Sequence, residues 1–263
     1  MLDLTVAEIR EQLRKADAKA FEVLERSLVA DARKGVRSAV EVARRRLEAE
    51  SAERERLSRL YSFEAEIAAE RNANAVIGLD EVGRGPLAGS LAVGAVVLDG
   101  DSVIEGLNDS KQVKPEDRVL IAEQVKQLAR AWTVRYIEPA DIDAHGMTSS
   151  LKSAFRQAIS DIEQQGVAVD LVLLDGNPLH IDDREVNVVK GDGRCASIAA
   201  ASIIAKVERD ALMVNLDGLY PGYGFAANKG YASPEHIEAI ERLGLSPVHR
   251  ASFCTSFTQP TLF

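Results

Sequence analysis

The chain has 263 residues, of which 46% are hydrophobic and 28% are charged, and its formal net charge at pH 7 is −9. Such a composition is ordinary for a globular protein with a sizeable core. The acidic balance excludes a broad basic surface for nucleic acid, but it is compatible with a small site in which cations neutralise carboxylates. No run of roughly 18 apolar residues occurs and the first residues form no signal-peptide pattern, so we expect a cytoplasmic protein.

Several common kinds of site are excluded by their missing motifs. The two cysteines, Cys195 and Cys254, and the four scattered histidines form none of the spacings typical of structural zinc sites. The chain has no P-loop and no Ser-His-Asp or Cys-His nucleophile motif. The carboxylates are therefore the groups to follow along the chain.

Residues 1–72 form a first part that contains no proline, one glycine, 15 basic and 15 acidic residues. Apolar residues recur there at helical spacing, Thr5 and Glu8 fit a capping box, and a long helix is expected from Val36 to about Asn72. Arg44-Arg45-Arg46 could contact a phosphate backbone, or could lie on a solvated face balanced by nearby glutamates, which the sequence favours. We expect a helical N-terminal extension that handles a partner or the substrate.

From residue 73 the sequence changes character, because all eight prolines and all but one of the glycines lie in this part. Strand-like segments alternate with helical ones, which is typical of an α/β fold with helices packed on a mixed sheet. We expect strands at Ala75–Leu79, Ser90–Leu98, Trp132–Ile137, Val169–Leu174 and Glu185–Val189. We expect helices at Pro115–Arg130, Met147–Gln164, Ser197–Val214 and Pro234–Leu243. The predicted domains are thus the extension at 1–72 and an α/β domain with a helical C-terminal part at 73–263.

Three predicted strands each end in acidic residues. Asp80 and Glu81 follow the first strand, Asp175 follows a nearly continuous apolar strand, and Asp192 follows the next one. Each acid alone fits a turn or a cap, but in an α/β sheet the strand ends are where sites assemble. Four converging carboxylates would repel one another, and divalent cations with a preference for oxygen ligands, Mg²⁺ or Mn²⁺, would resolve that conflict. Two such ions can promote in-line displacement at a phosphodiester.

The segment Gly83-Arg84-Gly85 directly follows the first pair of acids. Its backbone is bare enough for another polymer to approach closely, although glycines of an ordinary turn would look the same. Further along, the small residues of Ala196–Lys206 would let a helix lie close against the sheet.

Taken together, these segments resemble the bacterial ribonuclease HII family. The matching motifs run in family order over about residues 74–256 and comprise Gly78–Pro86, Asn108–Lys111, Leu174–Gly176, Val189–Asp192, Ile198–Asp210, Lys229–Tyr231 and Ser246–Arg250. The resemblance implies a ribonuclease H-like fold. It also implies a metal-dependent endonuclease that cuts RNA within RNA–DNA duplexes and nicks DNA 5′ to an embedded ribonucleotide, leaving 5′-phosphate and 3′-hydroxyl ends.

The resemblance also assigns roles to residues. The metal-binding and catalytic acids of the family fall on Asp80, Glu81, Asp175 and Asp192, with Asp80 bridging the ions. Adjacent residues of a regular strand point to opposite faces, so the chain must bend at Glu81, or Glu81 must act through its carbonyl or a water molecule.

Substrate contacts are implied at a second set of positions. The backbone of Gly83, Arg84 and Gly85 would read the 2′-OH that separates RNA from DNA, and Tyr231 would stack against the next sugar. Candidate phosphate contacts, for which solvated loop residues are the alternative and Lys111 is the favoured member, are Ser110, Lys111, Lys190 and Lys229. Asp210 is expected to support its helix.

Two alternatives stay open. The chain could be a duplex-binding module that does not cut, or an enzyme like ribonuclease HIII, which prefers longer RNA tracts. A binder would gain nothing from an acidic cluster that faces phosphate. We expect a monomer with RNA–DNA duplexes as its partner and a possible protein partner for residues 1–72.

Overall fold

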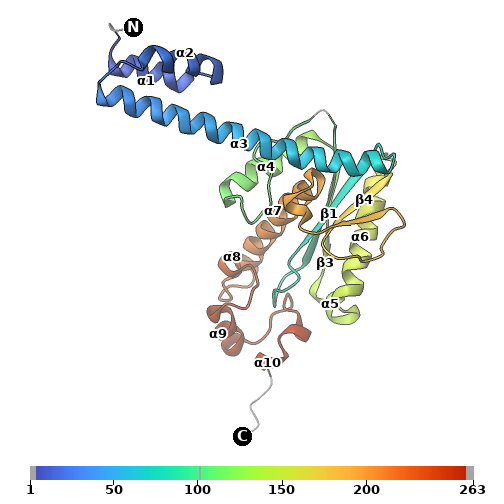
Figure 1. Ribbon diagram of the computed structural model, residues 1–263. Coiled ribbons are helices and arrows are strands. Elements are labelled where there is room, and N and C mark those ends of the chain that lie inside the picture. Colours follow the sequence, from blue (N-terminus) through green and yellow to red (C-terminus); the bar gives the residue numbers. More distant parts are fainter. Residues whose placement is uncertain (1–3, 101, 259–263) are drawn as a thin grey trace. The chain divides into compact units, whose positions relative to one another are not determined.

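The computed structural model describes residues 4–100 and 102–258 (Figure 1). The chain divides into two compact units, Met1–Ser58 and Arg59–Phe263. The division lies inside the long helix α3 (Lys34–Glu70), so the last turns of this helix belong to the second unit. None of the helices within the described residues is long and apolar enough to cross a membrane.

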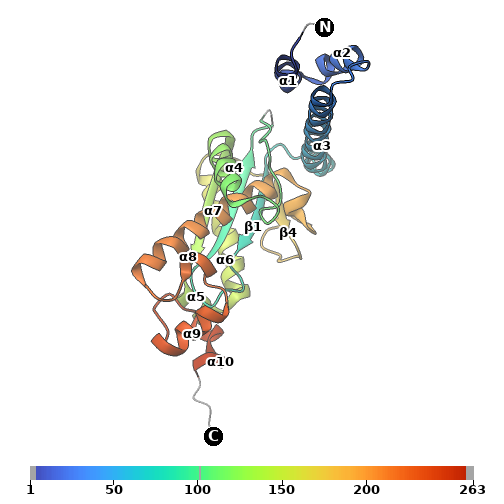
Figure 2. The same ribbon diagram turned by 90° about the vertical axis from the view of Figure 1, so that its left-hand side faces the viewer.

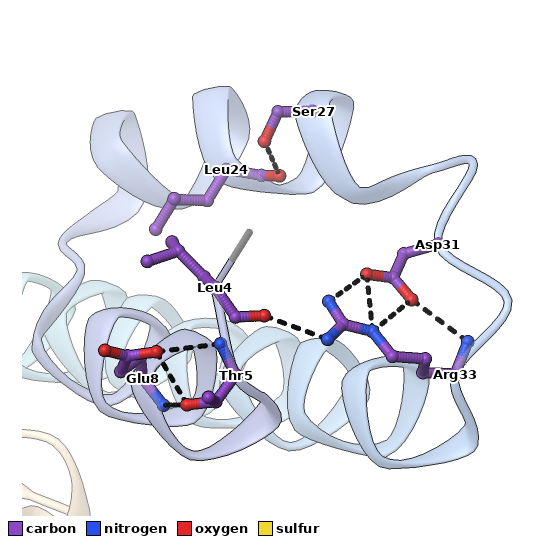
Figure 3. Close-up of polar contacts among 7 residues, drawn as sticks. All are labelled: Leu4, Thr5, Glu8, Leu24, Ser27, Asp31 and Arg33. Atoms are coloured by element: carbon purple, nitrogen blue, oxygen red, sulfur yellow. Dashed lines mark hydrogen bonds and ion pairs between the residues drawn. The ribbon is translucent and has the colours of Figure 1, made fainter. Parts of the chain in front are cut away.

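The first unit is helical, as the sequence predicts. It contains α1 (Val6–Lys15), α2 (Ala18–Leu28) and the first part of α3. The predicted capping box is present: the Thr5 amide donates to the Glu8 carboxylate at 2.8 Å and the Glu8 amide donates to Thr5 Oγ1 at 3.3 Å (Figure 3). The unit has a hydrophobic core of its own, built from Ile9, Leu13, Ala16, Phe21, Leu28, Val36, Ala39 and Ala43.

The arginine triplet is used inside this unit. Arg44 and Arg45 both pair with Glu41, at 2.7 Å and 3.0 Å. Arg46 donates to the carbonyl of Ala16, which ends α1, at 2.6 Å. The interpretation of these arginines as a face balanced by glutamates is therefore confirmed.

The second unit is built on a mixed five-stranded sheet in the order β3-β2-β1-β4-β5. The central strand β1 pairs antiparallel with β2 and parallel with β4. The strands are β1 (Val76–Val82), β2 (Leu91–Leu98), β3 (Ala129–Ile137), β4 (Leu171–Asp175) and β5 (Glu185–Val188). All five predicted strands are present, and the ribonuclease H-like arrangement of a mixed sheet flanked by helices is confirmed.

Helices cover both faces of the sheet (Figures 1 and 2). The helices are α4 (Pro115–Leu128), α5 (Pro139–His145), α6 (Met147–Gln164), α7 (Ala196–Leu219), α8 (Phe225–Asn228), α9 (Pro234–Leu243) and α10 (Thr255–Thr258). The bounds of α6 and α9 agree with the predicted helices residue for residue. Phe155 and Ile159 of α6 lie in the main hydrophobic core together with Ile77 and Leu79 of β1.

On the other face, the backbone of α7 lies directly against the sheet. A Cβ atom added to Gly78 of β1 would lie 2.2 Å from the carbonyl carbon of Ser197, and one added to Gly94 of β2 would lie 2.2 Å from the oxygen of Ala201. The expectation that small residues let this helix approach the sheet is confirmed. The helix runs from Ala196 to Leu219, longer than predicted.

Because this contact is between backbones, no rotamer change can relieve added volume. We predict that Gly78→Ala destabilises the protein by about 1–3 kcal/mol, as measured by urea unfolding. Gly218→Ala is the matched control, since a Cβ atom there has no neighbour within 4 Å and the residue lies in α7. This control should stabilise the protein by up to about 1 kcal/mol. Equal effects of the two substitutions would contradict the prediction.

Candidate active site

The first pair of predicted acids lies inside a strand. We expected Asp80 and Glu81 after a strand that ends at Leu79, but β1 continues to Val82 because it stays paired with β2. What ends at Leu79 is the parallel pairing with β4, whose last pair is Leu79 with Leu174. Asp80 and Asp175 are the next residues of these two neighbouring strands, so the sheet places them side by side.

Asp80 is directed toward α7. It lies on the same face of β1 as Gly78, and its carboxylate accepts a hydrogen bond from the Ser202 hydroxyl of α7. The residue is only 8% exposed. Burial raises the pKa of Asp80 well above its usual range, and the neighbouring charges of Glu81 and Asp175 raise it further.

Glu81 lies on the opposite face of β1 by the alternation of the strand. The pairing of β1 with β2 runs unbroken from Ile77 to Val82, so the strand does not bend at this residue. The Glu81 carboxylate pairs with Arg84 at 3.1 Å. Burial raises its pKa, Arg84 opposes that shift, and the charge of Asp175 adds to it. Glu81 therefore feels the negative charge of Asp175, although its side chain lies on the opposite face of β1 from that of Asp80.

The other two acids are joined through a short turn. Asp175 ends β4 and accepts the amide of Gly191 at 2.6 Å. The 3-10 turn that begins at Gly191 carries Asp192, which is buried, with its carboxylate 3.5 Å from Lys111 Nζ. Burial raises the pKa of Asp192, as do the charges of Asp109 and Asp175, while Lys111 lowers it.

The donor set of this cluster suits a divalent cation. Its ligating atoms are carboxylate oxygens, which Mg²⁺ and Mn²⁺ prefer. Burial is the main cause of the raised pKa values of Asp80, Glu81 and Asp192, and neighbouring carboxylates add to it. No three acidic, histidine or cysteine side chains among the described residues already converge on one point. The donor chemistry therefore fits a cation, but the carboxylates would still have to turn toward it.

The structure brings the two predicted reading elements together. Gly83 has φ +94°, a conformation that favours glycine, and ends the strand just before Arg84 and Gly85. A Cβ atom on Gly85 would lie 3.9 Å from the ring of Tyr231, which is 46% exposed. An exposed backbone and an exposed aromatic ring thus share one surface.

The four candidate phosphate contacts differ in their surroundings. Lys111 and Lys190 are exposed. Ser110 is buried, and its hydroxyl and that of Ser202 are hydrogen-bonded to each other at 3.0 Å; Lys229 donates from Nζ to a neighbouring carbonyl at 2.7 Å. Lys111 and Lys190 are therefore accessible to a ligand, although Lys111 also pairs with Asp192, whereas Ser110 and Lys229 are engaged with the protein. Asp210 pairs with Lys206 at 2.7 Å on α7, as expected for a residue that supports the helix.

Several residues around the site had no role assigned from sequence. Ser202, which bonds Asp80, looks like one more small residue of α7. Arg209 and Arg250, both completely buried, donate to backbone carbonyls around Gly83. His236 and His249 form a buried pair whose Nε2 atoms lie 3.1 Å apart. Arg209, His249 and Arg250 lie in motifs of the family resemblance, and that was the one signal available in the sequence.

Comparisons with known proteins decide the family. The sequence model of Ribonuclease HII matches residues 77–256, and that of the Ribonuclease HII N-terminal domain matches residues 5–68. The chain belongs to the ribonuclease HII family. It is therefore a ribonuclease H, a nuclease that acts on RNA–DNA duplexes and depends on divalent metal.

Individual relatives agree over most of the chain. Ribonuclease HII of Listeria monocytogenes is 38% identical over 249 residues, which cover 95% of this chain and 94% of the relative. Ribonuclease HII of Ruminiclostridium cellulolyticum is 42% identical over 208 residues, covering 79% and 80%. Among solved structures, the complex of PCNA with RNase HII from Archaeoglobus fulgidus matches with a TM-score of 0.61 and 25% identity, covering 71% of this chain and 98% of that one.

The crowded carboxylates should make the metal-free protein less stable than a neutralised variant. A carboxyl whose pKa is raised by folding loses stability as pH rises through that value. With chelator at pH 7, Asp80→Asn should raise the free energy of unfolding by about 1–2 kcal/mol, and this gain should vanish as the pH approaches the ordinary carboxyl range. Asp210→Asn is the control, and should give no gain because Asp210 is ion-paired. A less stable Asp80→Asn protein at pH 7 would contradict the prediction.

Proposed function

We propose that this ribonuclease H is cytoplasmic, cuts the RNA strand of RNA–DNA hybrids and nicks DNA duplexes 5′ to embedded ribonucleotides. The observation that carries the proposal is the juxtaposition of Gly85 with the exposed ring of Tyr231, next to the strand that carries Asp80. Both elements recognise a sugar: the backbone can bond a 2′-OH, and the ring can stack against the sugar that follows. A nuclease for long RNA tracts would need no such pair.

The acids Asp80, Glu81, Asp175 and Asp192 would hold the metal, Mg²⁺ or Mn²⁺. When bound, two such ions supply an activated water and stabilise the leaving oxygen, which gives 5′-phosphate and 3′-hydroxyl ends. The support for this assignment is the all-oxygen donor set together with the raised pKa values of Asp80, Glu81 and Asp192.

Other residues of this chain would hold the duplex. Lys111 and Lys190 are exposed near the acids and would contact backbone phosphates, which the acidic cluster alone would repel. Gly83, Arg84 and Gly85 would read the 2′-OH through their backbone. Ser110 and Lys229 would act through the groups they bond in the protein, Ser202 and the loop before Tyr231.

The deciding experiment uses a labelled DNA duplex that carries one ribonucleotide, incubated with Mg²⁺, with Mn²⁺ and with chelator. We expect a metal-dependent nick 5′ to the ribonucleotide and no cleavage of an all-DNA duplex. Asp80→Asn and Asp175→Asn should each reduce the cleavage rate by at least about a hundredfold, while binding is kept because a negative charge near phosphate is removed.

Each other outcome of this assay selects an alternative. Cleavage restricted to long RNA tracts would support an activity like that of ribonuclease HIII and exclude the reading of single ribonucleotides. Binding without cleavage in any metal would support the non-cutting module. A folded Asp80→Asn protein that cuts at the wild-type rate would contradict the metal assignment.

We also propose that the helical extension strengthens substrate binding or contacts a partner in replication or transcription. It has its own hydrophobic core, and its arginine triplet pairs with glutamates of the same unit. Removing the extension tests both roles.

The point at which the chain is truncated determines whether contacts within the second unit are lost together with the extension. Tyr61 accepts the Ile104 amide at 2.9 Å, and half-buried Glu64 accepts the Ser197 amide at 2.7 Å at the start of α7. A chain that begins at Arg59 keeps both contacts, so we predict normal cleavage with weaker duplex affinity. A chain that begins at Asn72 should in addition lose about 1–2 kcal/mol of stability, as expected for a lost helix cap. Full affinity of the Arg59 chain would contradict a substrate-binding role.

A further inference from the structure

Two arginine side chains are completely buried beside the Gly83–Gly85 segment. Arg209 of α7 and Arg250 of the C-terminal part are each 0% exposed. Within residues 4–100 and 102–258, neither forms an ion pair with a carboxylate. Burial lowers the pKa of both, that of Arg250 to about 10. A buried guanidinium without a counter-charge is unfavourable unless its donors are satisfied, so the acceptors it binds define its role.

Arg250 stacks over the ring of Phe253, 5.4 Å from its centroid, and within the described residues its guanidinium donates to backbone carbonyls of the segment after β1. Its Nη2 donates to the oxygen of Gly83 at 2.7 Å and its Nη1 donates to that of Arg84 at 3.0 Å. Nε and Nη2 both donate to the oxygen of Gly89, at 3.1 Å and 2.8 Å. One planar guanidinium therefore fixes two successive peptide groups of the proposed reading segment and the loop that follows it.

Arg209 binds the neighbouring carbonyls. It donates to Ser90 at 2.9 Å, to Ala88 at 3.3 Å and to Lys229 at 3.0 Å, and so links the loop after β1 to the segment that carries Tyr231. A Cβ atom on Gly83 would lie 2.2 Å from Nε of Arg209. The missing side chain of Gly83 therefore leaves room for Arg209 as well as for the substrate.

These contacts determine where the amides of the segment point. In a trans peptide the carbonyl and the following N–H are antiparallel. Because the oxygens of Gly83 and Arg84 face Arg250, the N–H groups of Arg84 and Gly85 face the other way. Both residues are exposed, and in the described part of the chain neither amide has an acceptor. Two preorganised donors are left for a ligand.

We propose that Arg250 and Arg209 are positioning residues for ribonucleotide recognition, which hold the Gly83 and Arg84 carbonyls inward and so aim the Arg84 and Gly85 amides at the 2′-OH. The inference rests on the proposed reading of the ribonucleotide by this segment. It adds that the selectivity for RNA over DNA is set by two side chains that never touch the substrate. A lysine keeps the charge at either position but cannot span the same carbonyls.

The test compares binding to a DNA duplex with one ribonucleotide and to the same all-DNA duplex, by fluorescence polarisation, in a chain carrying Asp80→Asn to prevent cleavage. We expect Arg250→Lys to lower the preference for the ribonucleotide about tenfold, as for one lost hydrogen bond, and to leave affinity for all-DNA duplex unchanged. Arg209→Lys should lower it in the same direction. Arg156→Lys is the matched control, because Arg156 also donates to backbone carbonyls, but in another loop.

The outcomes separate this inference from the function on which it rests. If the Asp80→Asn parent shows no preference for the ribonucleotide, the proposed function fails. If the parent shows a preference and Arg250→Lys keeps it, only the role of the arginines fails. A loss of affinity for both duplexes alike would show a merely structural role and would also overturn the inference.

A measurement on the unmodified chain tests the same geometry if the variants do not fold. Hydrogen exchange followed by NMR should show the Arg84 and Gly85 amides exchanging rapidly in the free protein. The duplex with a ribonucleotide should slow them, and the all-DNA duplex should not. Slow exchange of both amides in the free protein would show that they face inward, which would overturn the inference.

Discussion

The functional half of this protein depends on how closely one helix backbone approaches the sheet. α7 lies against β1 and β2 at Gly78 and Gly94, where a single methyl group would overlap the helix backbone. At that separation Ser202 reaches Asp80, and Arg209 reaches the loop after β1. Because protein interiors are close-packed, a bulkier contact would move the whole helix outward and both side chains with it. The positions of the acidic cluster and of the Gly83–Gly85 segment therefore both depend on the close contact of α7 with the sheet.

The site then holds charge in two opposite ways. Asp80 and Asp192 are buried near other carboxylates, and both burial and these neighbours raise their pKa values. Arg209 and Arg250 have no carboxylate partner among the described residues and donate to carbonyl oxygens instead. The acids would gain a counter-charge from a bound cation, whereas the donors of the arginines already have acceptors in the protein. This difference fits acids that act on the substrate through metal and arginines that shape the backbone.

Sequence reasoning predicted most of the fold because its signals are local. Apolar runs mark the strands, and the bounds of α6 and α9 follow from helical spacing and start signals. It misplaced the end of β1, because β1 stays paired with β2 through Val82 and the partner strand is not visible in the segment itself. It missed the short helix α8 (Phe225–Asn228), which is too brief to show a period.

The same limit explains what was found in the site. Asp80 and Asp175 could be found because each sits at or near the end of a recognisable strand. The role of Arg209 could not be found from the sequence, because arginine is usually exposed and the acceptor Ser90 is 119 residues away in the chain. Ser110 carries a hydroxyl in a loop, and only the fold shows that it is buried against Ser202. The acids can thus be recognised from the residues next to them in the sequence, whereas the residues that support the site are recognised only from their contacts in the fold.

The buried pair of His236 and His249 fixes the backbone at Tyr231, as Arg250 fixes it at Gly83 and Arg84. The Tyr231 carbonyl can only accept, so His236, 2.8 Å away, must donate from Nδ1 and leave its Nε2 bare. His249 must then donate from Nε2, which leaves its Nδ1 to accept the Ser246 amide at 2.9 Å. Only neutral rings satisfy this chain, and burial lowers the pKa of both, that of His249 to about 4. The carbonyl of Tyr231 is thus held by a side chain of the C-terminal part, as those of Gly83 and Arg84 are held by Arg250. The sheet supplies the acids, and the C-terminal part fixes the backbone that surrounds the substrate.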